Sequence, residues 1–147
     1  MQISPMLIEH IPKVHEIEKE CFSDPWSIAS IESEHNDSAN IRFVAMVDDD
    51  VAGYGMMFVT KGIEANIENM AVKHNFRRQG IADELLAALV TAAGGLPIYL
   101  EVRANNVAAQ ELYKKHGFVA KGLRKEYYRK PTEDAIIMQL EGDDEKT

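Results

Sequence analysis

The feature that most constrains the fold is an apolar strand end that passes through a short turn into a helix. Met70 to Val72 form the strand end. Arg77-Arg78-Gln79-Gly80 then opens a helix whose apolar residues, from Ile81 to Val90, recur at helical spacing. The N–H groups and positive dipole end of a helix start stabilise an anion, and arginine adds charge-assisted hydrogen bonds. The segment therefore predicts a phosphate or pyrophosphate site, with an ordinary solvated helix start as the alternative.

The rest of the pattern predicts one α/β domain over residues 1–140, followed by a charged, frayed tail at 141–147. Helices are expected to begin near residues 8, 28, 81 and 106 and to end near 22, 36, 93 and 116. Strands are expected at 41–47, 51–60, 64–72, 98–102, 118–128 and 135–140. Ser27 is a predicted helix cap, Asp48 to Asp50 a predicted hairpin turn, and Gly117 a predicted helix end. This order indicates a mixed sheet with helices on its faces.

Charge, cysteine content and motif spacing exclude several other classes of protein. With a net charge of −8 in 147 residues, nucleic acid is not an expected partner, whereas a basic protein terminus is compatible. The single cysteine, Cys21, excludes an internal disulfide and lies on an apolar stripe, so an inert thiol is favoured over a nucleophile. The five histidines lack metal-ligand spacing, so no metal is expected. No apolar run could span a membrane and no signal peptide is recognisable, which predicts a cytoplasmic location.

Two other phosphate-binding patterns are missing from the sequence. No Gly-x-x-x-x-Gly-Lys-Ser/Thr run occurs, so a P-loop is excluded. Gly53-x-Gly55 lacks a third glycine and leads into a strand, which excludes a dinucleotide fingerprint.

Two motifs in the second half of the chain resemble the GNAT acyltransferases. Asn69-Met70-Ala71-Val72 with Arg77-x-x-Gly80-x-Ala82 is similar to the acetyl-CoA motif of that family, and the similarity continues through Asn106-x-x-Ala109-x-x-Leu112-Tyr113-x-x-x-Gly117-Phe118. The resemblance covers about residues 3–140 and implies the GNAT fold, a mostly antiparallel sheet of about seven strands with about four flanking helices. Three further segments resemble the RimI branch, bacterial enzymes that acetylate the N-terminal alanine of a small-subunit ribosomal protein. These are Phe22-Ser-Asp-Pro-Trp26-Ser27, Leu100-Glu101-Val102-Arg103, and Tyr127-Tyr128 through Met138.

The resemblance implies a binding site for acetyl-CoA as co-substrate. Met70, Ala71 and Val72 would pair with the pantetheine arm like an added strand, and one of their N–H groups would face the oxyanion. The pyrophosphate would be held by the turn and helix start, namely Arg77, Arg78, Gln79, Gly80, Ile81 and Ala82. Asn106 would hydrogen-bond the coenzyme from the start of the next helix. Ala82 stands where glycine is frequent in the family, and both residues are small.

Glu101 and Tyr113 are the expected acid–base pair. Strand alternation places Glu101 with Tyr99 and Arg103, away from the more apolar face of its strand. In RimI enzymes the matching glutamate is the general base and the matching tyrosine is the general acid. The alternatives are a solvated carboxylate for Glu101 and a packing phenol for Tyr113. Glu68 is a rival base, because other GNAT enzymes place a carboxylate in that region of the preceding strand.

The acceptor side is assigned by the same resemblance. Phe22, Pro25, Trp26 and Tyr128 match segments that border the peptide groove in related N-terminal acetyltransferases, although half-buried packing residues would look the same. Tyr127 and Tyr128 are neighbours on an expected strand, so only one of them should face the groove.

The leading hypothesis is an acetyl-CoA-dependent Nα-acetyltransferase that acts by direct transfer on a free protein N-terminus, with alanine as the expected first residue. No nucleic acid, membrane or obligate protein partner is expected. Two alternatives stay open. One is a GNAT enzyme that acetylates lysine side chains or small amines. The other is a coenzyme-binding sensor without turnover, which would need neither Glu101 nor Tyr113.

Overall fold

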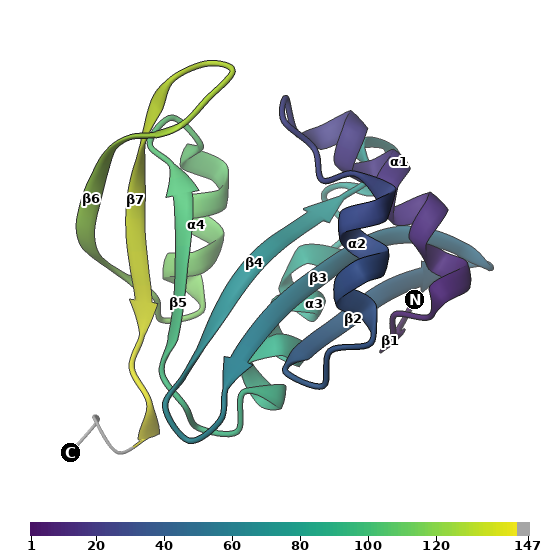
Figure 1. Ribbon diagram of the computed structural model, residues 1–147, viewed down its shortest axis with the longest axis horizontal. Coiled ribbons are helices and arrows are strands. Elements are labelled where there is room, and N and C mark those ends of the chain that lie inside the picture. The colour runs from purple at the N-terminus through teal and green to yellow at the C-terminus, as the bar shows by residue number, and fades with distance from the viewer. Residues whose placement is uncertain (144–147) are drawn as a thin grey trace.

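The computed structural model describes residues 1–143 and shows one seven-stranded sheet with helices on both faces (Figure 1). The strands are β1 (Gln2–Pro5), β2 (Asn40–Val47), β3 (Asp50–Thr60), β4 (Glu64–Val72), β5 (Ile98–Arg103), β6 (Val119–Tyr128) and β7 (Glu133–Leu140), in the spatial order β1-β2-β3-β4-β5-β7-β6. The α-helices are α1 (Ile11–Cys21), α2 (Ile28–His35), α3 (Ile81–Ala92) and α4 (Val107–Lys115), and two 3-10 helices are η1 (Ile8–His10) and η2 (His74–Phe76). All neighbouring strands are antiparallel except β4 and β5. The predicted α/β fold is therefore confirmed.

Local side chains and left-handed residues explain where several elements begin and end. The Ser27 hydroxyl accepts the N–H of Ser30 at the start of α2, which confirms the predicted cap. Asp48 and Asp49 have φ of 48° and 68°, the left-handed pair required by a tight hairpin turn between β2 and β3. Gly117 has φ of 96° directly after α4, as predicted for its end.

The two faces of the sheet carry separate apolar clusters. On one face, α1 and α2 pack on side chains of β2 and β3 that include Val44, Tyr54 and Met56. On the other face, α3 and α4 pack on a larger cluster that extends across β3, β4, β5 and β7 (Figure 1). Gly53 and Gly55 allow α3 to approach β3 closely, because added Cβ atoms would lie 3.2 Å from Leu85 Cδ1 and 2.9 Å from Leu89 Cδ1.

The sheet opens between β4 and β5. Within the described residues these strands pair only at Ala65–Ile98 and Asn66–Tyr99, and beyond that point they diverge (Figure 1). The connection through α3 supplies the crossover that two parallel strands need. The open edge of β4 therefore begins after Asn66 and runs to Val72.

The two ends of the chain differ from expectation. β1 is not among the strands expected from the residues, because it is only four residues long and ends in Pro5. It forms a strand because it pairs with β2. At the other end, Gly142 is buried and the N–H of Asp143 donates to the Gly95 oxygen at 2.9 Å, so the chain stays packed past residue 140. Residues 144–147 of the predicted tail lie outside the described residues. Within the part described, no helix combines the length and apolar character needed to cross a membrane.

Candidate active site

The open edge of β4 presents backbone groups that β3 does not use. The N–H of Lys73 donates to the Ala52 oxygen of β3 at 2.8 Å. Because successive N–H groups point to opposite sides of an antiparallel strand, those of Met70 and Val72 point away from β3. The Met70 N–H donates to Asn69 Oδ1 at 3.2 Å, and Arg77 Nε donates to the Val72 oxygen at 3.2 Å. These are the groups that an extended ligand could pair with.

The turn before α3 has the geometry of an anion-binding loop. Arg78 and Gly80 have φ of 63° and 79°, and Gly80 caps α3 without any side-chain hydrogen bond. Left-handed residues in such a turn aim successive N–H groups toward one point, where the helix dipole adds positive potential. The Arg77 guanidinium donates to the Val72 oxygen at the end of β4 and to Cys21 Sγ at the end of α1, and its role in anion binding stays a prediction.

Asp83 lies in the first turn of α3, where its charge would oppose a bound phosphate. Its Oδ1 is 2.7 Å from Lys115 Nζ and 2.9 Å from His116 Nε2. Hydrogen bonds from Lys115 and then His116 hold the pKa of the Asp83 carboxyl below its usual value. The opposing charge is thus compensated, and the start of α3 is tied to the end of α4.

Asn106 begins α4 with its side chain used as a helix cap. Its Oδ1 accepts the Ala109 N–H at 3.1 Å. No hydrogen bond within the described residues uses its Nδ2, so this group can still donate to a ligand.

Glu101 lies on the half-exposed face of β5 with Tyr99 and Arg103, as the alternation predicts. Its Oε1 is 3.7 Å from Arg124 Nε, whereas its Oε2 is buried and has no hydrogen-bond partner among the described residues. Buried acceptors without a partner are uncommon in native proteins, so this oxygen is suited to receive a donor from a ligand.

Tyr113 lies on the opposite, apolar side of the same region. Its side chain is 8% exposed, and its ring centroid is 5.8 Å from that of Phe118. Burial raises the pKa of Tyr113 to about 12. Burial is also the main reason why the pKa values of Tyr54 and Tyr128 are raised, and a smaller electrostatic contribution to both comes from Tyr113.

Glu68 occupies a bulge on β4. Met56 pairs with Asn69 and Met57 pairs with Ile67, which leaves Glu68 as the extra residue. Burial, and then the nearby charge of Glu34, raise the pKa of the Glu68 carboxyl. Its Oε1 is buried without a hydrogen-bond partner among the described residues, so Glu68 also fits a base.

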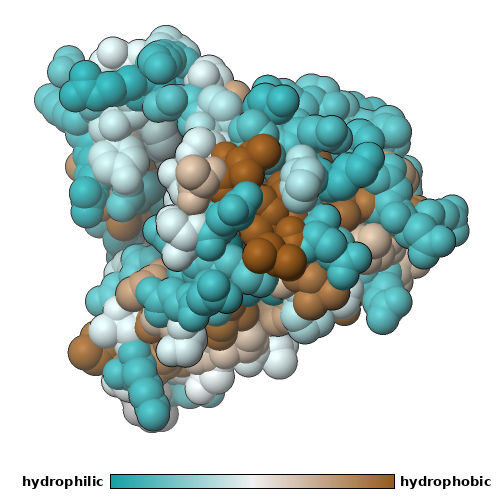
Figure 2. Space-filling view, turned by 45° about the vertical axis from the view of Figure 1, so that its right-hand side comes forward, coloured by the Kyte–Doolittle hydropathy of each residue, from teal (hydrophilic) through white to brown (hydrophobic). Residues whose placement is uncertain are grey.

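The α1–α2 loop contains the residues expected to form one wall of the acceptor side. Pro25 and Trp26 line a shallow hollow together with Asp24, Ser27, Ser30 and Glu34. Phe22 lies at the C-terminal end of α1 and is half-buried. Figure 2 shows a hydrophobic patch near the centre of the view, with smaller hydrophobic areas elsewhere on the same face.

The opposite wall contains Tyr127 and Tyr128, and here strand alternation is a wrong guide. The two rings are in edge-to-face contact with centroids 5.1 Å apart, because β6 bulges before Tyr128 and Glu126 has φ of 52°. Interaction with the Glu101 carboxylate raises the pKa of Tyr127, and Glu101 contributes to the raised pKa of Tyr128. Both tyrosines therefore lie on the Glu101 side.

Arg103 fixes this tyrosine wall. Its guanidinium lies 4.5 Å from the centre of the Tyr128 ring and donates to the Pro131 and Arg129 oxygens at 3.0 and 2.9 Å. The same group pairs with Glu133 Oε1 at 3.1 Å. The β6–β7 loop is thereby attached to the end of β5.

Glu18 is a site residue that the sequence analysis does not identify. Its side chain is fully buried and contacts Trp26, Tyr54 and Asn69. Its spacing could have revealed that it is buried, because Glu18 is four residues after Val14 and three before Cys21, on the apolar face of α1.

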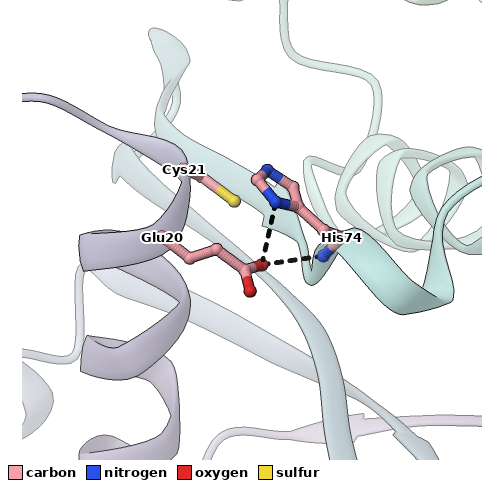
Figure 3. Close-up of side chains that lie close together, drawn as sticks. All are labelled: Glu20, Cys21 and His74. Carbon is pink, nitrogen blue, oxygen red and sulfur yellow. Dashed lines mark hydrogen bonds and ion pairs between the residues drawn. The ribbon is translucent and has the colours of Figure 1, made fainter.

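One group of possible metal ligands comes together that the sequence spacing does not indicate. Glu20 and Cys21 at the end of α1 face His74 of η2, with ligand atoms within 4.8 Å of one another (Figure 3). The His74 N–H donates to Glu20 Oε2 at 2.7 Å, and Arg77 Nη2 lies 3.4 Å from Cys21 Sγ. Burial raises the pKa of the Cys21 thiol. The guanidinium already places a positive charge at the sulfur, which opposes a second cation, and the expectation of no metal remains a prediction.

Comparisons with known proteins identify relatives over nearly the whole chain. Residues 11–118 match the Acetyltransferase (GNAT) family. A [Ribosomal protein bS18]-alanine N-acetyltransferase from Salmonella typhimurium is 34% identical over 146 residues, covering 94% of this chain and 95% of that protein. The N-alpha-acetyltransferase RimI of Mycobacterium tuberculosis is 33% identical, covering 88% of this chain and 85% of that protein.

Solved structures of acetyltransferases also resemble this chain over most of its length. The crystal structure of the ribosomal-protein-S18-alanine N-acetyltransferase from Escherichia coli superimposes with a TM-score of 0.87 at 32% identity, covering 95% of this chain and 92% of that one. Ard1 from Thermoplasma volcanium superimposes with a TM-score of 0.85 at 26% identity, covering 94% and 95%.

Proposed function

The chain belongs to the GNAT acetyltransferase family, and from that premise we propose that it transfers acetyl from acetyl-CoA to the free N-terminal amine of a protein. The expected acceptor is an alanine terminus, as in a small-subunit ribosomal protein, and the expected location is cytoplasmic. The observation that carries the proposal is the opening between β4 and β5, which has backbone groups unused by β3 on one side and Glu101 on the other. Relatives that align over most of both chains and are named alanine N-acetyltransferase and N-alpha-acetyltransferase support the choice of acceptor.

Acetyl-CoA would lie along the open edge of β4. The backbone of Met70, Ala71 and Val72 would pair with the pantetheine arm, because the Met70 and Val72 groups point away from β3. The N–H groups of the turn from Arg77 to Ala82 would bind the pyrophosphate, and Asn106 Nδ2 would donate to the coenzyme. The Arg77 guanidinium would have to leave the Val72 oxygen for that carbonyl to bind the ligand.

The chemistry needs three proton transfers around one direct attack: two from the amine nitrogen and one to the departing sulfur. An N-terminal ammonium has a pKa of about 7.7–8.0 and must lose a proton, which Glu101 would accept. The amine nitrogen then attacks the thioester carbonyl carbon, and the Met70 N–H would face the oxyanion once Asn69 releases it. The attack forms the C–N bond and leaves the nitrogen positively charged. Glu101, after passing its first proton to water, would accept a second proton from that nitrogen, and collapse breaks the C–S bond to give the amide and the coenzyme thiolate.

Tyr113 would assist departure of the sulfur. With a pKa raised to about 12, its hydroxyl stays protonated throughout the neutral range. A thiol has a pKa of about 8.5, so complete transfer from this phenol is uphill by roughly 3.5 units. Tyr113 therefore acts chiefly as a hydrogen-bond donor to the developing thiolate, with proton transfer following as the negative charge accumulates on sulfur.

One experiment separates this function from its alternatives. The protein is incubated with acetyl-CoA and peptides that begin with alanine, serine or methionine, together with N-terminally blocked lysine peptides and polyamines, and release of free thiol is followed. Transfer confined to free N-termini, and fastest to alanine, is the expected result. Faster transfer to lysine or polyamines would overturn the protein N-terminus as acceptor. Coenzyme binding without transfer to any acceptor would instead indicate a sensor.

A further inference from the structure

Glu18 joins three segments that the chain brings together from far apart. Its Oε2 accepts the backbone N–H of Trp26 at 3.1 Å, from the α1–α2 loop. Its Oε1 accepts the Tyr54 hydroxyl of β3 and the Asn69 Nδ2 group of β4. A single buried carboxylate therefore connects the acceptor loop with the strand at the opening.

The bond to Asn69 extends this connection to the Met70 amide. While Asn69 Nδ2 donates to Glu18, Asn69 Oδ1 accepts the N–H of Met70. Met70 N–H is the group assigned above to the oxyanion. The chain of contacts thus runs from the Trp26 backbone through Glu18 and Asn69 to Met70.

Packing alone does not account for a carboxylate at this place. Glu18 is fully buried on the apolar face of α1, and within the described residues it forms no ion pair. Burying an unpaired carboxylate is costly unless hydrogen bonds surround it. An apolar side chain between Val14 and Cys21 would serve the core without that cost. The distinctive property of glutamate here is that it accepts donors from several segments at once.

We propose that Glu18 is a positioning residue, which holds the loop from Phe22 to Ser27 against Asn69 and Met70 and so sets the distance from the acceptor amine to the reacting carbonyl. The inference rests on the proposed function for its catalytic consequence. Its structural half, that Glu18 fixes the Trp26 loop, can be tested without any activity.

The test is Glu18→Gln, which keeps the shape of the side chain but replaces one acceptor oxygen with an NH₂ donor. If Oε1 keeps its two donors, the new NH₂ group faces the Trp26 N–H, and the loop loses its attachment. We expect the KM for an alanine peptide to rise roughly tenfold, while the KM for acetyl-CoA changes less than about twofold.

Trp26 supplies a second readout, since it is the only tryptophan in the chain. In Glu18→Gln its emission should shift to the red, and acrylamide should quench it more strongly. Tyr54→Phe is the matched control, because it removes one bond to Glu18 but leaves those of Trp26 and Asn69. This variant should lower Tm without moving the peptide KM or the Trp26 emission.

The outcomes decide between positioning and bulk stability. Unchanged peptide KM and unchanged Trp26 quenching in Glu18→Gln would overturn the proposal, as would equal changes in Tyr54→Phe. If Glu18→Gln does not fold, Glu18→Asp keeps the charge but is too short to reach all three donors, and the same two readouts apply. If the wild-type protein acetylates none of the acceptors, the proposed function fails, while Trp26 quenching alone still shows whether Glu18 fixes the loop.

Discussion

Backbone groups form most of the side of the opening where the coenzyme is proposed to bind, whereas side chains form the side proposed for the acceptor. On the coenzyme side, the β4 edge and the turn into α3 offer N–H and C=O groups whose directions follow from strand alternation and from φ at Arg78 and Gly80. On the acceptor side, the walls depend on side-chain contacts such as Arg103 with Tyr128 and Glu18 with Trp26. Under the proposed function, coenzyme binding would therefore rest on local geometry, and choice of the acceptor would rest on contacts between distant segments.

The largest expected effect concerns the base. Glu101→Gln should lower kcat/KM by about 10²–10⁴, because the amide cannot take the proton of the acceptor amine. Glu68→Gln should change kcat/KM by less than about threefold if Glu68 only bears charge near Arg42 and Glu34. Steady-state rates across pH measure both. Near-normal activity in Glu101→Gln with loss of activity in Glu68→Gln would show that the general base is Glu68, in the bulge of β4, and not Glu101 on β5.

The next effect concerns the leaving group. Tyr113→Phe should lower kcat by roughly 10- to 100-fold, with little change in either KM, because the hydroxyl acts when the C–S bond breaks. Since burial raises the pKa of Tyr113 to about 12, ionisation of this residue should cause no decline in the wild-type rate as pH rises to about 10. A fall in the wild-type rate near pH 9 that disappears in Tyr113→Phe would contradict this assignment.

A smaller effect is expected on the KM for acetyl-CoA, and it tests whether the backbone geometry of the turn before α3 matters beyond general backbone strain. Gly80→Ala forces a Cβ onto a residue with φ of 79°, which should raise the KM for acetyl-CoA about fivefold and leave the peptide KM unchanged. Gly62→Ala is its matched control, with φ of 76° and equally open surroundings, but in the β3–β4 turn. Both substitutions should lower Tm by similar amounts. Equal changes in coenzyme KM would mean that strain, and not the anion loop, is responsible.

The smallest effect is on stability. Hydrogen bonds from Lys115 and His116 depress the pKa of Asp83, so this carboxylate stabilises the fold at pH values above its unfolded pKa of about 3.9 and loses that contribution as pH falls through its lower folded pKa. Because the group is partly exposed, Asp83→Asn should cost only about 0.5 kcal/mol at neutral pH. Urea unfolding at several pH values measures this. If the difference in unfolding free energy between the wild type and Asp83→Asn persisted or grew in acid, the predicted pH dependence would be wrong.

The fold was more predictable from the sequence than the details of the site. The apolar spacing from Ile81 to Leu89 and the alternation around Glu101 are local patterns, and both appear in the structure. The family resemblance is confirmed by the match over residues 11–118. β1 could not be predicted because its structure depends on pairing with β2, and a four-residue pattern does not indicate a partner strand.

The missed features of the site depend on contacts far apart in the sequence. Tyr127 and Tyr128 share one side because of a bulge in β6, and strand alternation cannot reveal a bulge. Arg77 turns back toward Val72 and Cys21, and the latter is 56 residues away. The roles of Glu101, Tyr113 and the other site residues remain predictions until the variants are measured.

The two pairs that join β4 to β5 also affect the folding stability of the protein. The strands on either side of the opening are otherwise held together by the apolar cluster that includes Ile67, Leu100 and Tyr113, without a continuous hydrogen-bond ladder. An extended ligand paired with β4 would supply main-chain bonds that the polypeptide itself does not form there. Thermal stability should therefore rise with the concentration of coenzyme, and bound coenzyme should slow amide exchange most at Met70 and Val72, whose N–H groups point away from β3.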